Sequence, residues 1–319
     1  MSGGYRLDQG GRINRARPVS FRLDGHHMQG FDGDSLASAL VANGVRIVAR
    51  STRLRRPRGI MALGPEDPDG LFRVRDGHGS DPCARAGLVP LVEGMEAETL
   101  SGRAGPRLDP LAPVQALAGF LSAGFYCKTF KWPGWSWYEG AIWSMTGHGS
   151  VEAAPDPRRR EMRHDSCDVL VIGAGPAGLA AARALAGAGR RVLLADARPQ
   201  AGGSLLWEET RIDGQPGIDW AASVVAGLCA NGHRWLPDTT ATGAYEGGMF
   251  TLLQALRDDR GLVGERIWKL RARAVVLATG AHDRPMPFAD NDRPGIFLAR
   301  AVRGSSGATA WRLAGGLRS

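Results

Sequence analysis

The hydrophobic pattern of the chain is dominated by one uninterrupted apolar run, Val169–Ile172, which a glycine-rich turn follows directly. A run of this length predicts a strand that is buried on both faces of a parallel sheet. The next segment, Leu179–Ala188, is rich in Ala and Leu and lacks proline, which predicts a helix. A second apolar run, Val192–Ala195, predicts another strand. The pattern therefore predicts a strand–turn–helix–strand unit of an α/β protein.

The N-terminal part of the chain has shorter periodic segments. Pro18–Leu23 alternates between apolar and polar residues, and the Asp24-Gly25 pair after it is a hairpin turn signal. The Asp34-Ser35 pair predicts the cap of a helix over Leu36–Asn43. Further strands are predicted at His27–Phe31, Val45–Val48 and Leu71–Val74. A hairpin, a helix and further strands in this stretch predict a small β-grasp domain.

The turn after the first apolar run reads GAGPAG over residues 173–178 and has the spacing of a dinucleotide-binding loop. Gly173 permits the tight turn, Gly175 lets the backbone approach a pyrophosphate, and Gly178 lets the helix pack closely on the strand. The helix N-terminus then directs its N–H groups and the positive end of its dipole at the phosphates. The strand, the helix, the second strand and a following acid all agree with this interpretation.

That acid, Asp196, can accept hydrogen bonds from ribose hydroxyls. Its charge disfavours the 2′-phosphate of NADP, whereas Arg198 nearby would attract one. A second glycine pair at 202–203 and the ATG at the end of a predicted strand, Arg271–Leu277, also suit a cofactor loop. The candidate cofactor-binding residues are Gly173, Gly175, Pro176, Ala177, Gly178, Asp196, Gly203, Thr279 and Gly280. NAD and FAD share the ADP half that these residues would bind, so the motif alone leaves both open.

These patterns divide the chain into five parts. We expect a flexible tail (1–11), a β-grasp domain (12–100), a connector (101–165), a dinucleotide-binding domain (166–303) and a C-terminal tail (304–319). A further helix is predicted at Ile218–Ala230, and further strands at Thr239–Thr242 and Phe250–Ala255. The fold class is therefore α/β, with a Rossmann-like domain preceded by a small β-grasp domain.

The charge balance raises nucleic acid as a partner. The chain has 40 Lys and Arg against 32 Asp and Glu, a formal net charge of +8 and a pI near 9.9. The arginines are scattered, however, and no helix-turn-helix or zinc-finger pattern accompanies them. We therefore expect no binding to nucleic acid.

The cysteines, at positions 83, 127, 167 and 229, are far apart and form no CxxC pair. This spacing argues against a zinc site or a disulfide scaffold and fits a reducing cytoplasm. The N-terminus lacks the apolar core of a signal peptide, and no stretch has the length and apolarity of a membrane span. We expect a cytoplasmic protein without a metal site.

Two clusters of side chains each allow two interpretations. Four tryptophans lie close together in the sequence, at Trp132, Trp135, Trp137 and Trp143. They form either an interface for a partner chain or a flavin, or the packing of a linker on its neighbouring domains. The His-Asp-Arg triplet at 282–284 is either a catalytic cluster or a set of loop residues that contact cofactor or partner. Because no nucleophile accompanies the triplet, no catalytic residue is assigned.

Three motifs resemble the α chain of heterotetrameric sarcosine oxidase. The first, near the N-terminus, is RPVSFRLDGHHMQGFDGDSLASALVANGVRIVARS followed by RRPRGIMALGPEDP, where that family is similar to a plant-type ferredoxin domain. The second is the GFYxKTFxWP pattern before the glycine loop, and the third is VVLATGAHDRPMPFADNDRPGIFLARAVR. The resemblance covers roughly residues 12–303.

The resemblance implies an oxidoreductase component that acts on CH–NH groups. The family oxidises sarcosine to glycine, a one-carbon unit and hydrogen peroxide, on FAD in a separate β subunit. It implies NAD in the dinucleotide fold of the α chain and FMN at the α/β interface. It also implies partners, namely small subunits and the flavin-bearing β subunit. The alternative is an FAD-binding subunit of an opine, hydroxyproline or proline oxidase complex.

The resemblance also bears on iron–sulfur chemistry. Cluster-bearing cousins carry cysteines in the loop after PRG, whereas Ile60–Leu71 has none and Cys83 is alone. A cluster takes four thiolates. We therefore expect a ferredoxin-like domain without a cluster and no iron–sulfur cofactor.

The resemblance ends near Arg303, before the Gly-, Ser-, Ala- and Arg-rich tail. The sequence accordingly predicts a truncated copy with an incomplete dinucleotide-binding domain. A parallel sheet that lacks strands exposes unpaired backbone and apolar surface. We expect such a chain to be poorly soluble or partly molten and inactive alone, and a non-catalytic fragment is the remaining alternative.

Overall fold

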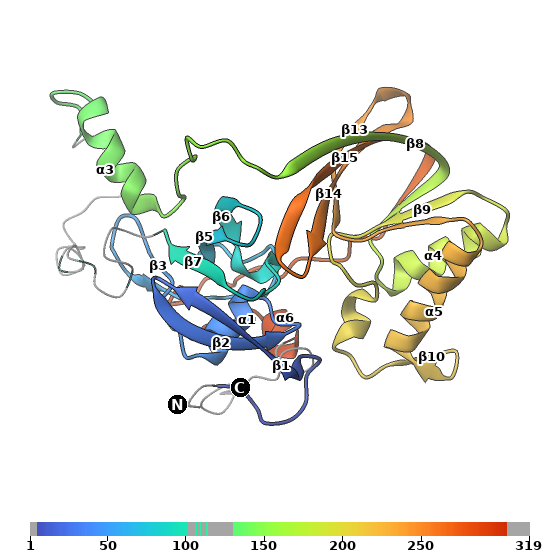
Figure 1. The fold of residues 1–319 in the computed structure, drawn as a ribbon, viewed down its shortest axis with the longest axis horizontal. Coiled ribbons are helices and arrows are strands. Elements are labelled where there is room, and N and C mark those ends of the chain that lie inside the picture. The colour runs from blue at the N-terminus through green and yellow to red at the C-terminus, as the bar shows by residue number, and fades with distance from the viewer. Residues whose placement is uncertain (1–4, 101–105, 107–108, 110–112, 114–129, 305–319) are drawn as a thin grey trace. The chain divides into compact units, whose positions relative to one another are not determined.

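The computed structural model describes residues 5–100, 106, 109, 113 and 130–304 (Figure 1). Much of the predicted connector and the predicted tail after Gly304 lie outside these residues. The chain forms two compact units. The central unit is Pro157–His282, and the N-terminal unit combines Met1–Asp156 with Asp283–Ser319. The segment that follows the ATG motif therefore belongs to the N-terminal unit, although the sequence assigned it to the dinucleotide-binding domain.

The N-terminal unit is built on a five-stranded sheet in the order β2-β1-β7-β5-β6 (Figure 1). Its strands are β1 (Asn14–Leu23), β2 (His26–Asp32), β5 (Leu71–Arg75), β6 (Ser80–Arg85) and β7 (Met95–Thr99). Asp24 and Gly25 join β1 to β2 with positive φ angles of 48° and 80°, as a two-residue Asp-Gly hairpin requires. Strand β7 pairs in parallel with β1 and antiparallel with β5, which gives the mixed sheet of a β-grasp domain.

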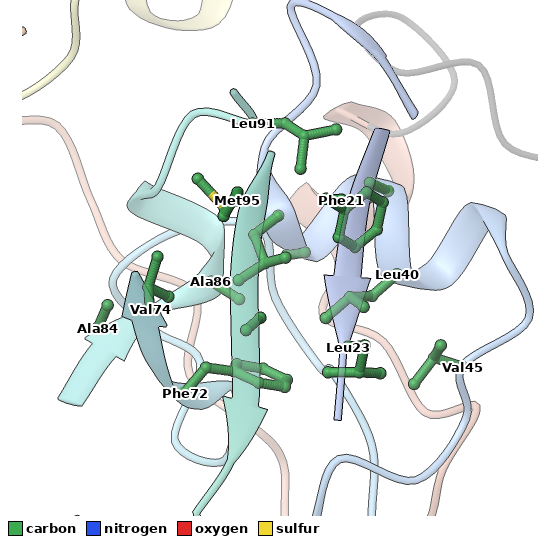
Figure 2. Close-up of a cluster of buried hydrophobic side chains, with 14 of the residues drawn as sticks. Phe21, Leu23, Leu40, Val45, Phe72, Val74, Ala84, Ala86, Leu91 and Met95 are labelled. Atoms are coloured by element: carbon green, nitrogen blue, oxygen red, sulfur yellow. The ribbon is translucent and has the colours of Figure 1, made fainter. Parts of the chain in front are cut away.

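One helix, α1 (Leu36–Ala42), packs against this sheet. Ser35 caps it by accepting a hydrogen bond from the Ser38 N–H, and the Ser38 hydroxyl accepts one from the Ser35 N–H. The apolar core includes Phe21 from β1 and Met95 from β7, together with residues of α1 (Figure 2). The predicted hairpin and helix are thus both present.

The strand expected at Val45–Val48 does not form. Both valines are buried in the core, 4% and 1% exposed, and lie in a segment without strand pairing. The short strands of this region are β3 (Ala49–Arg50) and β4 (Pro57–Arg58), which pair with each other. The apolar spacing therefore reflects packing in the core rather than a place in a sheet.

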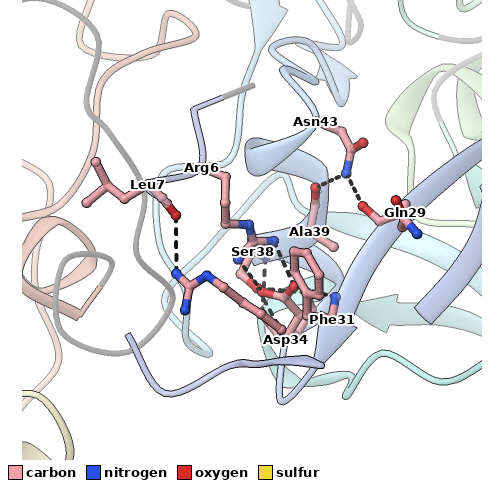
Figure 3. Close-up of polar contacts among 10 residues, drawn as sticks. Arg6, Leu7, Gln29, Phe31, Asp34, Ser38, Ala39 and Asn43 are labelled. Carbon is pink, nitrogen blue, oxygen red and sulfur yellow. Dashed lines mark hydrogen bonds and ion pairs between the residues drawn. The ribbon is translucent and has the colours of Figure 1, made fainter. Parts of the chain in front are cut away.

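A buried carboxylate ties the start of the described chain to α1 (Figure 3). Asp34 accepts hydrogen bonds from both terminal nitrogens of Arg6, at 3.0 and 2.7 Å, and from the Ser38 hydroxyl. The Arg6 guanidinium also lies 5.5 Å from the centre of the Phe31 ring. Arg6 is thus held against the domain, although its polar, Gly-rich surroundings predicted a flexible tail. The reason is a buried partner that local composition does not reveal.

A second buried carboxylate organises the loop between β4 and β5. Asp67 is 2% exposed. Its Oδ2 accepts hydrogen bonds from the N–H groups of Met61 and Ala62 at 2.8 and 2.9 Å. Its Oδ1 accepts from the N–H groups of Asp69 and Gly70 at 2.9 and 2.6 Å. One side chain therefore fixes both ends of this loop.

The segment after His282 packs onto the same loop. The N–H of Leu298 donates to the Met61 carbonyl oxygen at 2.9 Å, and the two side chains share an apolar cluster. Arg56 and Arg58 form ion pairs with Asp292 at 2.7 and 3.2 Å. Among the described residues of this unit, the other helices are α3 (Ser136–Thr146), α6 (Ala299–Gly304) and the short η1 (Ala86–Leu88).

The central unit contains a six-stranded sheet in the order β12-β9-β8-β15-β14-β13 (Figure 1). The strands of this sheet are β8 (Arg159–Ile172), β9 (Val192–Ala195), β12 (Arg234–Leu236), β13 (Thr239–Tyr245), β14 (Met249–Asp258) and β15 (Gly261–Leu277). The unit also contains the helices α4 (Pro176–Gly187) and α5 (Gly217–Ala230). Its shorter elements are η3 (Gly203–Leu206), η4 (Glu246–Gly248), β10 (Arg211–Ile212) and β11 (Gln215–Pro216). The first four strands of the sheet are parallel, and β15, β14 and β13 are antiparallel. Residues of α4 and α5 share an apolar core with β8 and β9.

Strands β8 and β15 are both longer than the segments that predicted them, Val169–Ile172 and Arg271–Leu277. Strand β8 begins at Arg159, within the stretch assigned to the connector, and pairs with β15 along its length. The added pairs carry charge: the Glu161 carboxylate accepts a hydrogen bond from Arg266 at 3.0 Å.

Within the described part of the chain, no helix has both the length and the apolarity to cross a membrane.

Candidate functional site

The glycine loop connects the carboxyl end of β8 to the N-terminus of α4. Gly173 has a φ of 104°, and a Cβ at this position would overlap the carbonyl oxygen of Ala278. A Cβ on Gly178 would overlap the carbonyl oxygen of Gly173. Both positions therefore admit only glycine, because backbone atoms occupy the space on each side. They hold strand, turn and helix together.

Gly175 differs from these two glycines. Its φ of −73° and ψ of −179° are open to any residue, and the nearest atom to a Cβ there would be the Gly203 Cα at 4.0 Å. Gly175 is the N-cap of α4, and without a side chain it leaves the amides of the first turn uncapped. Pro176 follows at the first helical position, where its missing N–H is not needed. A Cβ at this helix N-terminus would thus make only an ordinary van der Waals contact, and the absence of a side chain lets the backbone approach an anion.

The second glycine pair packs against this loop. The N–H of Gly202 donates to the Ala174 carbonyl oxygen at 2.8 Å. Gly203 has a φ of 58°, and a Cβ there would lie 2.8 Å from the Gly175 Cα. The two glycine loops therefore meet backbone to backbone. Gly203 is needed for this contact, in addition to any contact that it makes with a ligand.

Asp196 lies between the two loops, directly after β9. Its Oδ2 accepts a hydrogen bond from the Ala174 N–H at 2.6 Å, and its Oδ1 accepts one from the Arg198 N–H at 2.9 Å. The carboxylate is half-buried and each oxygen keeps a further lone pair. It can thus brace the glycine loop and still accept hydrogen bonds from a ligand hydroxyl.

The ATG segment reaches the same edge of the sheet. Ala278 donates its N–H to the Ile172 carbonyl oxygen at 2.8 Å, directly beside the glycine loop. The Thr279 nitrogen would lie 3.1 Å from a Cβ on Gly173, and Gly280 has a φ of 72° with open space around it. The fold therefore brings all three predicted loops together at the carboxyl ends of β8, β9 and β15.

The His-Asp-Arg triplet at 282–284 crosses the boundary between the two units. Asp283 accepts a hydrogen bond from the Arg300 N–H at 2.6 Å, in the first turn of α6, and belongs to the N-terminal unit. His282 is the last residue of the central unit. In the residues that the structure describes, no group of three or more His, Cys, Asp or Glu side chains is arranged to hold a metal ion.

A further acid follows the next parallel strand. Asp238 comes after β12, has a φ of 47° and donates its N–H to the Arg198 carbonyl oxygen at 3.1 Å. Burial raises the pKa of its carboxyl group, and Arg257 offsets this only in part. Sequence reasoning did not select this residue, because only the strand order places it beside Asp196.

Asp238→Asn should stabilise the chain modestly at neutral pH. A carboxyl with a raised folded-state pKa contributes stability only while protonated, and that contribution is lost as pH rises through the folded pKa. Asn avoids this loss and tolerates the positive φ. Thermal melts should show a higher Tm than the native chain at pH 7, with a gain that shrinks as pH falls towards the ordinary value of 3.8. A gain independent of pH, or a lower Tm, would contradict the assignment.

Two protein families match parts of the chain. Residues 16–102 match the family described as "2Fe-2S iron-sulfur cluster binding domain". Residues 167–312 match the family "Pyridine nucleotide-disulphide oxidoreductase" and so extend past Arg303. The solved structure of L-proline dehydrogenase from P. horikoshii superposes with a TM-score of 0.60 at 20% identity, covering 98% of this chain and 50% of that one. A ferredoxin-like domain followed by an α/β oxidoreductase domain, as predicted, is therefore confirmed.

The first match corrects the expected cofactors. The sequence led us to expect NAD or FAD, together with FMN, and no iron–sulfur cluster. The exclusion of the cluster was wrong, because the matching family binds one and so suggests an iron–sulfur cofactor. The fit of individual side chains is limited. The matched segment has one cysteine, Cys83, which is exposed on β6, whereas a cluster takes four ligands. The second family remains compatible with a flavin.

Curated relatives match nearly the whole chain. The alpha subunit of sarcosine oxidase from Rhizobium meliloti (strain 1021) is 42% identical over 310 residues, which are 94% of this chain and 31% of the relative. The alpha subunit of sarcosine oxidase from Corynebacterium sp. (strain P-1) is 38% identical over 300 residues, 92% of this chain and 27% of the relative. An opine oxidase subunit of Agrobacterium tumefaciens (strain Ach5) is 34% identical over 149 residues, 44% of this chain and 29% of the relative.

The chain spans less than a third of the length of these relatives, with coverages of 31%, 27% and 29%. The opine oxidase match is shorter and weaker than the sarcosine oxidase matches. The two units and the glycine loop of this chain, together with identities of up to 42%, confirm the family that the motifs predicted. The chain is a homologue of sarcosine oxidase alpha subunits over 94% of its own length.

Proposed function

We propose that this chain is the dinucleotide-binding part of a sarcosine-oxidase-like enzyme. Residues 173–178 would hold the pyrophosphate of an ADP-containing dinucleotide, and Asp196 would hold its ribose. Gly203, Thr279 and Gly280 would border the ligand. The N-terminus of α4, where Gly175 provides no side-chain cap and no side chain blocks the backbone, is the observation that carries this proposal.

The substrate class follows from the family. We propose that the complete enzyme oxidises the CH–NH group of a secondary amine, with sarcosine as the first candidate. The sarcosine oxidase relatives match over twice the length that the opine oxidase relative does, 310 against 149 residues, so an opine is the weaker candidate. The chain would supply cofactor binding, and no described side chain is proposed as the catalytic group for amine oxidation.

Partner subunits are part of the proposal, because the relatives are named as subunits. The segment around helix α3 offers a suitable surface: Trp132, Trp135, Trp137 and Trp143 are 83%, 46%, 78% and 56% exposed. Tryptophan is enriched at the centres of protein interfaces. A cytoplasmic location is also proposed, supported by the three free cysteines of the described residues.

Asp196→Ala tests the ribose assignment. We expect ADP-ribose to bind about 1–3 kcal/mol more weakly in calorimetric titrations, the usual effect of losing a charged hydrogen-bond partner. Asp196→Asn is the matched variant, because it keeps one acceptor oxygen and should bind with intermediate affinity. Unchanged affinity in both variants would remove Asp196 from the site.

The bound cofactor can be identified directly. Protein purified with its partner subunits should release an ADP-containing dinucleotide on denaturation. A visible flavin absorption band in the isolated chain would identify FAD, whereas a colourless chain that releases NAD would identify the nicotinamide dinucleotide. Release of neither compound would contradict the proposed function.

A further inference from the structure

One face of the antiparallel part of the central sheet is exposed. Strands β13, β14 and β15 and the first half of β8 lie side by side there (Figure 1). Directly paired residues point to the same side of a sheet. The register therefore gives one face, which we call the outer face, to Met162, His164, Tyr245, Met249, Leu253, Ile267, Lys269 and Arg271. All of these side chains are half-buried or exposed.

The opposite face of the same strands belongs to the core. Trp268 and Leu270 of β15 and Leu252 of β14 are 5%, 0% and 0% exposed. They share an apolar cluster with Leu193 and Leu236. A sheet that packs on one side normally carries polar side chains on the other. The outer face departs from this rule.

An apolar row crosses the outer face at one level of the register. Met162 of β8 pairs with Ile267 of β15, and Ile267 pairs with Leu253 of β14. Met162 and Ile267 are 51% and 41% exposed, and Tyr245 on the edge strand β13 is 55% exposed. Apolar side chains that adjoin one another on an exposed sheet face indicate a surface that another molecule covers. Methionine and tyrosine are enriched at protein interfaces, which favours a protein as this molecule.

The charges on the two sides of this row differ. On one side, Arg160 and Glu265 form an ion pair with 3.7 Å between Nε and Oε2. On the other side, Lys269 and Arg271 follow Ile267 along β15, and both are exposed. Arg271 donates to the Gly247 carbonyl oxygen at 3.4 Å, but among the described residues neither cation forms an ion pair with an acid. The outer face therefore combines an apolar row with uncompensated positive charge.

We propose that the outer face binds an acidic surface of a partner protein, with apolar side chains over Met162 and Ile267 and carboxylates beside Lys269 and Arg271. The inference rests on the proposed function, since it names a surface for the partner subunits proposed there. It adds a contact in the central unit to the tryptophans of the N-terminal unit. A second copy of this chain is the weaker occupant, because two copies that met through this face would bring like charges together.

Zero-length cross-linking tests this chemistry directly, because a carbodiimide joins a lysine amine to a carboxylate in contact with it. The chain has three lysines, at positions 128, 131 and 269, so mass spectrometry can assign a cross-link to the outer face. In the full chain purified with its partner subunits, Lys269 should be joined to an Asp or Glu of another polypeptide. Lys269→Arg should keep the partner bound and lose this cross-link, because it retains the charge but not the amine.

Titrations of the chain with the isolated partner subunits test the charge and the apolar row separately. Lys269→Glu should weaken binding about tenfold or more at low salt, because the partner's acids would meet a like charge, and native binding should weaken as salt is added. Met162→Ser should weaken binding about fivefold and leave its salt dependence unchanged. Arg190→Glu is the matched control, since it reverses an exposed charge in the turn between α4 and β9. All three variants should keep the native Tm and the native affinity for ADP-ribose.

The outcomes separate this inference from the dinucleotide site. Native partner affinity in both Lys269→Glu and Met162→Ser would overturn the inference, as would a Lys269 that stays unmodified or is joined only to acids of its own chain. A cross-link from Lys269 to a second copy of this chain would assign the outer face to self-association and overturn the acidic partner. A chain that binds ADP-ribose but assembles with no partner would overturn the outer face alone. A native chain that binds no ADP-ribose would instead overturn the dinucleotide site.

Discussion

A chain that carries Gly175→Val is expected to fold normally and to lose its affinity for ADP-containing dinucleotides. The backbone of Gly175 is open to any residue, and the nearest atom to the new Cβ would be the Gly203 Cα at 4.0 Å. The side chain would instead fill the space proposed for the pyrophosphate. Losing two N–H to phosphate hydrogen bonds, at about 1.5–3 kcal/mol each, would weaken binding about 100-fold or more. Titration with ADP-ribose and a thermal melt measure the two effects separately.

Two glycines of the same helix serve as controls. Gly178→Ala should unfold or strongly destabilise the central unit, because its Cβ would overlap the Gly173 carbonyl oxygen. Gly187→Ala, with nothing within 4 Å of the added Cβ, should leave binding unchanged and stabilise the helix by about 0.5–1 kcal/mol. Retained nucleotide affinity in Gly175→Val would remove the glycine loop from the site, whatever the melting temperature.

Asp67→Asn should destabilise the N-terminal unit by about 2–6 kcal/mol. The carboxylate accepts hydrogen bonds from the N–H groups of Met61 and Ala62 on one oxygen, and of Asp69 and Gly70 on the other. An amide keeps one acceptor oxygen and turns its NH₂ group towards the other pair of donors. Two buried N–H groups would lose their partner, at about 1–3 kcal/mol each. This is a large share of the about 5–15 kcal/mol that stabilises a typical domain.

Urea unfolding followed by circular dichroism measures this loss. The matched control is Asp69→Asn on the same loop. Burial raises the pKa of Asp69, and the neighbouring Asp67 and Asp292 raise it further against the effect of Arg58. Removing this charge should therefore have a small or stabilising effect at neutral pH. Equal unfolding midpoints for Asp67→Asn and the native chain would show that the loop does not depend on the carboxylate.

Much of the fold was readable from local signals. The Asp24-Gly25 turn, the Ser35 cap and the run from Val169 to Ala195 each predicted the element that forms, because turn chemistry, capping and apolar period act over a few residues. The motif resemblance likewise identified the family. The iron–sulfur expectation was wrong, since a count of cysteines was weighed above the likeness of the whole domain.

Other elements could not be read from local patterns. The strand expected at Val45–Val48 is absent because those valines are buried by packing rather than pairing. The first half of β8 was missed because its charged residues satisfy one another across strands, as Glu161 does with Arg266 at 3.0 Å. Arg6 was assigned to a tail because its partner, Asp34, lies elsewhere in the sequence.

The sequence by itself determined the strand–loop–helix–strand unit, the two-domain order and the set of candidate glycines. Tertiary structure decided what each glycine does. A Cβ on Gly173 or Gly178 would overlap a backbone carbonyl oxygen, and one on Gly203 would lie 2.8 Å from the Gly175 Cα. Of these four glycines, only Gly175 would place an added Cβ at an ordinary van der Waals distance, 4.0 Å from the Gly203 Cα. Tertiary structure also placed Arg198 on Trp207. Such distinctions depend on atoms that come together only when distant segments pack, and no local spacing contains them.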